Sequence, residues 1–165
     1  MEDKKGLYNA LDVARFTINY TWKINKPISN LKLQKILYFI QADYLANTDK
    51  GPCFIDEIEA WDFGPVVPSV YHEFKKYGSS FIPKINTYLD MTNGLWDAKM
   101  VKYDDKKIEE SDKEIIIDVI KMLVPYSAGR LVEITHRQKP WMDTYQSYCN
   151  NIIPKKLIKE YFSKK

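Results

Sequence analysis

The sequence is poor in the residues on which most enzyme and metal sites depend. Its 165 residues include only two histidines, two cysteines and six glycines. Two histidines exclude a three-histidine metal site, and His72 lacks the second histidine four residues later that the helical zinc motif requires. The glycines are scattered, so there is no glycine-rich phosphate loop, and Gly-x-Ser-x-Gly is absent. We therefore expect no enzyme: no catalytic residues, no metal site and no cofactor.

A long apolar run is also missing. The longest apolar stretch, around residues 36–40, is far too short to cross a bilayer. The first residues are polar, and charges interrupt the apolar residues after them, so we expect no signal peptide. Cys53 and Cys149 lie far apart and resemble no metal motif. These absences predict a cytoplasmic protein that makes no contact with a membrane.

The excess of positive charge is small. The net charge is +3 and the pI about 8.6, below the strongly basic balance of a dedicated nucleic-acid binder. Lysines gather in two groups, and a pair of helices that carries such basic residues could resemble a DNA-binding helix-turn-helix. Bidentate base contacts favour arginine, and the chain has little of it, so we favour a solvated lysine face over nucleic-acid binding. The grouped lysines are Lys23, Lys26, Lys32, Lys35, Lys155, Lys156, Lys159, Lys164 and Lys165.

The first half of the chain carries the clearest helical pattern. Apolar residues spaced three and four apart predict amphipathic helices over residues 7–22 and 31–45. Pro27 separates them, and either Ser29 or Asn30 caps the second helix by accepting an unpaired backbone N–H. The apolar arc of the second helix is too wide for a solvent-facing element. We therefore place this helix at the centre of the core.

Short helices and breakers alternate along the rest of the chain. A β-like run over residues 54–61 ends at a Gly-Pro turn, and Gly78 stops the helix that follows. Residues 79–110 show no readable pattern and end in a charge run. Ser111 and Glu114 form a capping box for a later helix. The expected helices of this half cover residues 68–77, 111–123, 127–137, 139–148 and 155 onward.

This order of elements predicts a mainly α fold. We expect a compact single-domain helical bundle with a small β-sheet or hairpin, α+β at the margin, over residues 1–165. Aromatic residues are plentiful at 14%, with twelve tyrosines and four tryptophans. Such side chains fill cores, and their polar tips also suit partly hydrated protein interfaces.

Residues 59–74, EAWDFGPVVPSVYHEF, form the most informative segment. Gly64 permits a close approach or a positive φ, and Pro65 stiffens the turn. Asp62 could accept hydrogen bonds from the N-terminus of the following helix. A stiff turn that carries aromatic side chains is also suited to presenting a binding surface. The sequence alone does not divide the structural role from the functional one.

His136 has two interpretations. It is either a partner contact that responds to pH near neutrality, or a helix-end residue that interacts with the last carbonyls of its helix. We favour the second, with Trp141 as a core anchor that joins the last two helices. An enzyme would be favoured only if His72 or His136 lay in a polar cleft beside a carboxylate.

Three segments, LKLQKILYFIQADYL, IEAWDFGPVVPSVYHEFKKYG and SAGRLVEITHRQKPW, follow one another in the order and spacing of a known family. The chain resembles the Panacea domain family, also called SocA-like or GepA-like, from about Leu7 to the last helix. The most specific element is AWDFGPVV at residues 60–67. The Thr135-His136 pair with Pro140-Trp141 downstream is the second.

The resemblance implies an antitoxin of a bacterial or phage toxin–antitoxin system. Such a protein would neutralise a protein toxin, encoded by the adjacent gene, through direct binding. It implies that the shared motifs hold the fold and that specificity lies on exposed faces and loops such as residues 79–110. The alternatives are an adaptor that delivers a toxin or another client to a protease, and a DNA-binding autoregulator. The partner-binding residues predicted from the family motifs are Asp62, Phe63, Tyr71, His72, His136 and Trp141.

Overall fold

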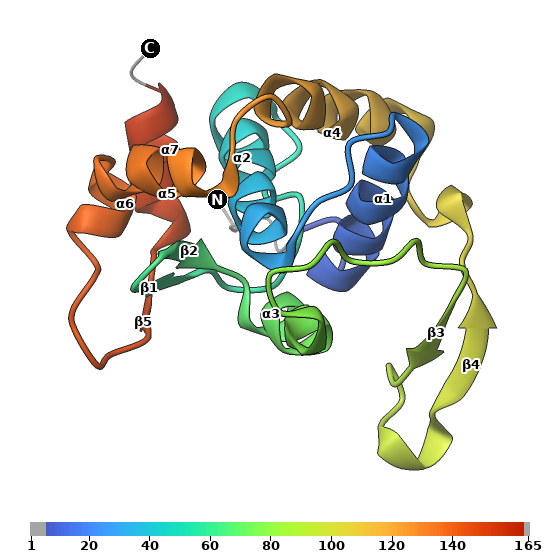
Figure 1. Cartoon of the computed structure of the whole chain (residues 1–165). Helices are drawn as coiled ribbons and strands as arrows, with labels where there is room; N and C mark the ends of the chain where they lie inside the picture. The colour runs from blue at the N-terminus through green and yellow to red at the C-terminus, as the bar shows by residue number, and fades with distance from the viewer. Residues whose placement is uncertain (1–5, 164–165) are drawn as a thin grey trace.

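The computed structural model describes residues 6–163. It is mainly α, with two small antiparallel sheets, so the predicted fold class is confirmed (Figure 1). The polar start of the chain and two of the grouped lysines, Lys164 and Lys165, lie outside the described residues. The helices are α1 (Ala10–Lys23), α2 (Asn30–Asn47), α3 (Pro68–Phe74), α4 (Glu110–Leu123), α5 (Ala128–His136), α6 (Lys139–Met142) and α7 (Lys155–Ser163).

Helix α2 is the central element, as predicted. It contacts α1, α3, α4, α5, α7 and the strand β2 (Gly64–Val66), and side chains around most of its circumference are buried. In Figure 1 it lies between α1 and α4 on one side and α5 to α7 on the other. Ser29, and not Asn30, is its cap, because the Ser29 hydroxyl accepts from the backbone N–H of Lys32 at 3.3 Å.

The larger sheet has the strand order β2-β1-β5, with β1 at Glu59–Trp61 and β5 at Asn151–Ile152. Its β1–β2 register pairs Ala60 with Pro65 and Trp61 with Gly64, as a tight turn requires. β5 was not predicted from the sequence, because its two residues are too few to show an alternating apolar pattern.

The second sheet is a hairpin of β3 (Thr87–Asp90) and β4 (Lys99–Lys102). It lies in the segment where no pattern was readable, and it projects from the helical body at the lower right of Figure 1. A 3-10 turn at Leu95–Asp97 forms its tip. The missing pattern has a physical cause, because no residue of either strand is fully buried and the core therefore imposes no apolar alternation on them.

Two predicted helix boundaries are wrong. The capping box does not form: α4 begins at Glu110, with no side-chain cap, so Ser111 already lies inside the helix. Its start is set by Asp112, which is 2% exposed and accepts hydrogen bonds from Tyr44 at 2.6 Å and from Tyr8. Burial would raise the pKa of Asp112, but its hydrogen bonds, that from Lys50 the strongest, outweigh burial and lower it.

The helix expected over residues 139–148 ends at Met142. The chain turns there, and the Tyr145 backbone N–H donates to the Trp141 carbonyl at 2.8 Å. The helix predicted to reach Tyr77 is α3 followed by a 3-10 turn at Lys75–Tyr77, and Gly78 ends it at φ +56° as predicted. No helix among residues 6–163 is both long and apolar enough to cross a membrane.

Candidate functional site

The turn between β1 and β2 is packed directly onto the central helix. Gly64 has a φ of +101°, which favours glycine. A Cβ atom at this position would lie 2.7 Å from both the Lys35 Cε and the Thr135 Oγ1. Only glycine therefore lets the turn approach α2 and α5 so closely.

Polar side chains of α2 hold the backbone of the segment after this turn. The Gln34 Oε1 accepts from the Val67 N–H at 2.9 Å, and its Nε2 donates to the Asn30 Oδ1 at 2.8 Å. The Asn30 Nδ2 in turn donates to the Tyr71 carbonyl at 3.1 Å. Each buried polar group has a partner, so this ladder positions β2 and α3 precisely.

Lys35 completes the support and corrects a prediction. Its side chain is fully buried and its Nζ donates to the Pro65 carbonyl at 2.9 Å, so it is not part of a solvated lysine face. Burial lowers the pKa of Lys35 to about 7. Lys32 is also engaged, since its Nζ donates to the Val124 carbonyl at 2.7 Å. The sequence did contain a signal for the burial of Lys35. This lysine lies in a helix whose apolar residues cover most of its circumference, so the helix has no solvated face.

Aromatic rings gather on the outer side of the turn in two groups. In the first, the Trp61 ring meets Tyr71 edge to face at 4.9 Å between centroids, and His72 lies 6.2 Å from Trp61 and 5.5 Å from Tyr71. Such arrangements are favoured by the ring quadrupoles. Helix α3 therefore places the side chains of Tyr71 and His72 against the end of β1.

The second group lies on the other side of the turn. Trp141 is stacked between His136 at 4.1 Å and Tyr145 at 4.5 Å. The Trp141 Nε1 donates to the Trp61 carbonyl at 2.8 Å. The His136 Nε2 lies 3.0 Å from the Asp62 carbonyl, which can only accept, so this nitrogen donates. His136 therefore contacts a neighbouring turn, and not the last carbonyls of its own helix as we had favoured.

Asp62 is also placed differently from the prediction. Its carboxylate accepts from the Tyr145 hydroxyl at 2.5 Å, and not from the N-terminus of α3. This hydrogen bond raises the pKa of Tyr145. The chain turn after α6 brings Tyr145 to this position, which the helix predicted over residues 139–148 would not have done.

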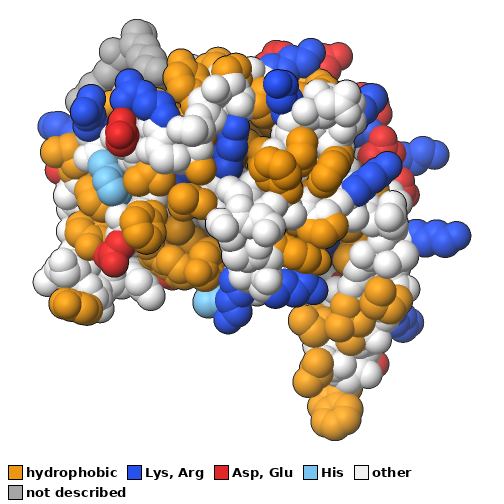
Figure 2. Space-filling model, in the orientation of Figure 1, with side chains coloured by type: hydrophobic (Ala, Val, Ile, Leu, Met, Phe, Trp, Pro, Cys, Tyr) orange, Lys and Arg blue, Asp and Glu red, His pale blue; other side chains and the backbone are white. Residues whose placement is uncertain are grey.

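We call the two groups, together with Asp62 and Phe63 of the turn between them, the aromatic face. All six predicted residues lie in it, and sequence reasoning missed Trp61 and Tyr145. Figure 2 shows hydrophobic side chains and histidine together over this left part of the molecule. The face comprises Trp61, Asp62, Phe63, Tyr71, His72, His136, Trp141 and Tyr145.

A groove of about 510 Å³ opens beside the first group. Asp62, Phe63 and Tyr71 line it, whereas His72, His136 and Trp141 do not. Phe63 is 66% exposed at its edge. The face offers aromatic surface and hydrogen-bonding groups, which suit recognition of another protein. Among residues 6–163, no three His, Cys, Asp or Glu side chains converge to hold a metal ion.

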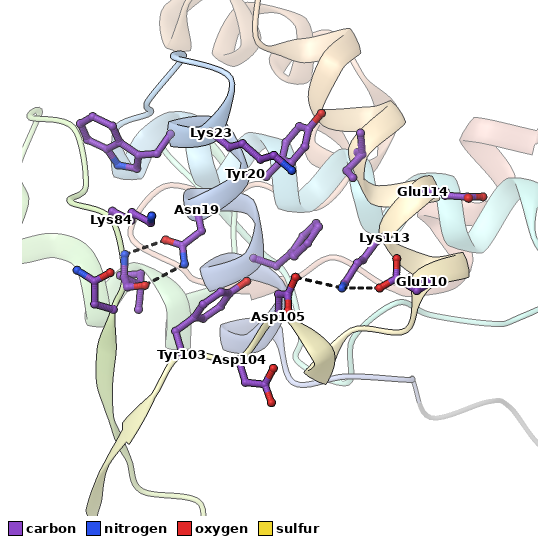
Figure 3. Close-up of a pocket in the computed structure, with 15 residues that line it drawn as sticks. Asn19, Tyr20, Lys23, Lys84, Tyr103, Asp104, Asp105, Glu110, Lys113 and Glu114 are labelled. Carbon is purple, nitrogen blue, oxygen red and sulfur yellow. Dashed lines mark hydrogen bonds and ion pairs between the residues drawn. The ribbon is translucent and has the colours of Figure 1, made fainter.

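A larger cavity, of about 880 Å³, lies between α1, α4 and the chain on either side of the β3–β4 hairpin (Figure 3). Three of its charged side chains pair with one another: the Lys113 Nζ lies 2.8 Å from Glu110 and 3.4 Å from Asp105. Asn19 makes two hydrogen bonds to the backbone of Ile85. None of the predicted site residues lines this cavity. Its walls hold the base of the hairpin, and we assign it no ligand.

Comparison with known proteins agrees with the resemblance. Residues 33–142 match the family model described as "Antitoxin SocA-like, Panacea domain". The chain is 34% identical over 135 residues to the protein named Antitoxin SocA of Caulobacter vibrioides (strain NA1000 / CB15N), covering 81% of this chain and 68% of that protein. No solved structure matches the chain significantly. The aromatic face and the α2 side chains that support it lie within or beside the matched segment, and the chain belongs to the SocA-like antitoxin family with a Panacea domain.

Proposed function

We propose that the protein is an antitoxin that neutralises a protein toxin by binding it directly, and that the aromatic face is part of the interface. The observation that carries this proposal is the family match over residues 33–142. An antitoxin requires a toxin, and we expect the adjacent gene to encode it, on a chromosome or a phage. Family membership also supports the expectation that the chain is not an enzyme.

The construction of the aromatic face supports a role in binding. Its backbone is held by buried hydrogen bonds from α2, so little conformational entropy would be lost when a partner docks. Phe63 projects from this rigid turn. Large aromatic side chains on rigid supports are the typical hot spots of protein interfaces. We therefore expect Phe63, with Tyr71 at the neighbouring groove, to carry much of the affinity.

Co-expression with the product of the adjacent gene tests this proposal. The toxin alone should stop growth, the pair should grow, and the two proteins should elute together. Phe63→Ala should abolish rescue while the variant stays folded. Tyr126→Ala, which alters a 43%-exposed aromatic residue between α4 and α5, is the control and should rescue fully. Rescue by Phe63→Ala without loss of affinity would remove the aromatic face from the interface.

The same experiment separates the two alternatives. If the toxin disappears when both proteins are present and accumulates again in a protease-deficient strain, the chain is an adaptor for proteolysis. Binding to duplex DNA that weakens steeply with salt would indicate an autoregulator. Lys32 and Lys35 are engaged within the fold, which removes two of the cations on which a DNA-binding surface would have drawn. The cytoplasmic location and the single domain over residues 1–165 remain part of this proposal.

A further inference from the structure

The β3–β4 hairpin has two unlike faces. Its register pairs Tyr88 with Val101 and Leu89 with Met100, and neighbouring pairs point to opposite faces. The Arg15 guanidinium lies 3.7 Å from the centre of the Tyr88 ring, so the Tyr88 face is turned toward α1. The Leu89–Met100 pair therefore lies on the other face, where Leu89 is 44% and Met100 67% exposed. We call residues 87–102 the arm.

The arm is fastened at its base and free at its tip. Arg15 is buried, and its contact with Tyr88 is a cation–π interaction in a site with little solvent. The Asn19 Oδ1 accepts from the Ile85 N–H at 2.8 Å, and the Asn19 Nδ2 donates to the Ile85 carbonyl at 2.9 Å. The Tyr103 N–H donates to the Asn86 carbonyl at 2.8 Å and closes the base. Such anchoring orients the arm while leaving its tip accessible.

The free part of the arm is apolar, which is costly for a surface without a partner. Trp96 is 98% exposed and Leu95 74%, and Met100 is 67% exposed on the outer face. Figure 2 shows hydrophobic side chains along the arm and at its tip. Contiguous exposed apolar surface of this kind marks a site of interaction. The strip consists of Leu89, Met91, Leu95, Trp96 and Met100.

Trp96 also differs from the other tryptophans in its hydrogen bonding. The Nε1 groups of Trp22, Trp61 and Trp141 donate to the Ile82 carbonyl, to Glu59 and to the Trp61 carbonyl. Trp96 has no acceptor among residues 6–163. A pocket that receives Trp96 would therefore be apolar with one hydrogen-bond acceptor.

The charges of the arm define the rim of such a pocket. Lys99 and Lys102 on β4 form no ion pair within the described part of the chain. The Asp90 carboxylate beside them accepts from the hydroxyl and the backbone N–H of Thr92, which lowers the pKa of Asp90. The charges left to meet a partner are thus the two cations of β4 and Asp97 beside Trp96, which also forms no ion pair within residues 6–163. Carboxylates on the partner would complement the two cations.

We propose that the arm inserts Trp96 into an apolar pocket of the toxin that is rimmed by carboxylates, and thereby selects which toxin the protein binds. This inference rests on the proposed function and adds a second contact. The occupant is a folded protein, because a projecting tip requires a concave receptor. The arm lies at the opposite end of the molecule in Figure 1 from the β1–β2 turn, so its contribution can be altered without touching the aromatic face.

Titration of the purified full-length chain with the product of the adjacent gene tests the arm. Trp96→Ala should weaken binding at least about 30-fold, since it removes a central aromatic anchor. Lys99→Glu should weaken it about 5- to 10-fold and slow association most at low salt. Met122→Ala is the control, because Met122 on α4 is 68% exposed, matching Met100, and should change the affinity less than twofold.

Fluorescence gives a second reading that does not depend on affinity. When the product of the adjacent gene binds, the fluorescence emission of Trp96 should shift to the blue and should no longer be quenched by iodide. Trp96→Phe should abolish this shift. If Trp96→Ala binds with full affinity, the proposed role of the arm is wrong, while the proposed function is unaffected. If the unaltered protein neither binds nor rescues, both proposals fall. The free chain could instead form a dimer that Trp96→Ala dissociates. That result would show that the arm binds a second copy of the chain, and its proposed role in toxin binding would be wrong.

Discussion

The β1–β2 turn and the β3–β4 arm are built from the same local parts and end in opposite environments. Each is a short antiparallel pair whose chain reversal contains a glycine with positive φ, Gly64 at +101° and Gly94 at +94°. A Cβ at Gly64 would collide with Lys35 and Thr135, whereas one at Gly94 would meet nothing within 4 Å. Side chains from α2 hold the first, and the second is held only at its base. The difference shows that packing, and not hairpin chemistry, makes one turn rigid and leaves the other open.

The largest expected effect comes from filling the space beneath the turn. Gly64→Ala should lower the free energy of unfolding by about 3 kcal/mol or more, because it adds backbone strain and a 2.7 Å contact. Gly94→Ala adds strain alone and should cost only about 1 kcal/mol. Urea unfolding of the two variants measures both values. Equal losses would show that packing does not distinguish the two turns.

The buried lysine should give the stability a pH dependence that the arm lacks. The pKa of Lys35 is about 7, below the ~10.4 of an unfolded lysine, so above pH 7 the unfolded state binds more protons. The free energy of unfolding should therefore rise with pH from 7 to 8.5, by at most ~1.4 kcal/mol per unit, relative to Lys35→Met. Lys99→Met in the arm should keep the wild-type profile. Parallel profiles for the protein and Lys35→Met would refute this account.

Loosening the base of the arm should have a local effect. Arg15→Ala removes the cation–π contact with Tyr88, worth about 1–2 kcal/mol at a buried site. Backbone amides of residues 87–102 should then exchange hydrogen faster, while those of the β1–β2 turn keep their protection. Arg130→Ala, which breaks an exposed pair with Glu133, is the control. Faster exchange at both hairpins would mean that Arg15 supports the whole fold.

The smallest effect is expected at the tip of the arm. Trp96 is 98% exposed, so Trp96→Ala should change the free energy of unfolding by less than about 0.5 kcal/mol. The thermal midpoint of the two proteins, measured at equal concentration, checks this. A large loss would show that Trp96 packs on the body, which would contradict its role as a free anchor for a partner.

Much of the fold was predictable from periodicity. The central helix, the helix before it and the Pro68 start of α3 follow from apolar spacing and from proline, and the structure confirms them. The capping box at Ser111 was wrong because Asp112 is drawn into a buried hydrogen-bond cluster, a contact between segments distant in the chain. The site was half predictable: the six residues are together, but Tyr145 reaches Asp62 only through an unpredicted turn. Whether they bind a toxin stays a proposal.

The amino-acid sequence by itself determined the helical class, the stiff Gly-Pro turn and, through three motifs, the family. These depend on local spacing and residue type, which a linear chain displays directly. Tertiary structure alone decided that Lys35 is a buried support of the turn and that residues 87–102 form an exposed arm. The reason is that burial is a property of what lies across the fold, and nothing in the spacing of neighbouring residues records it.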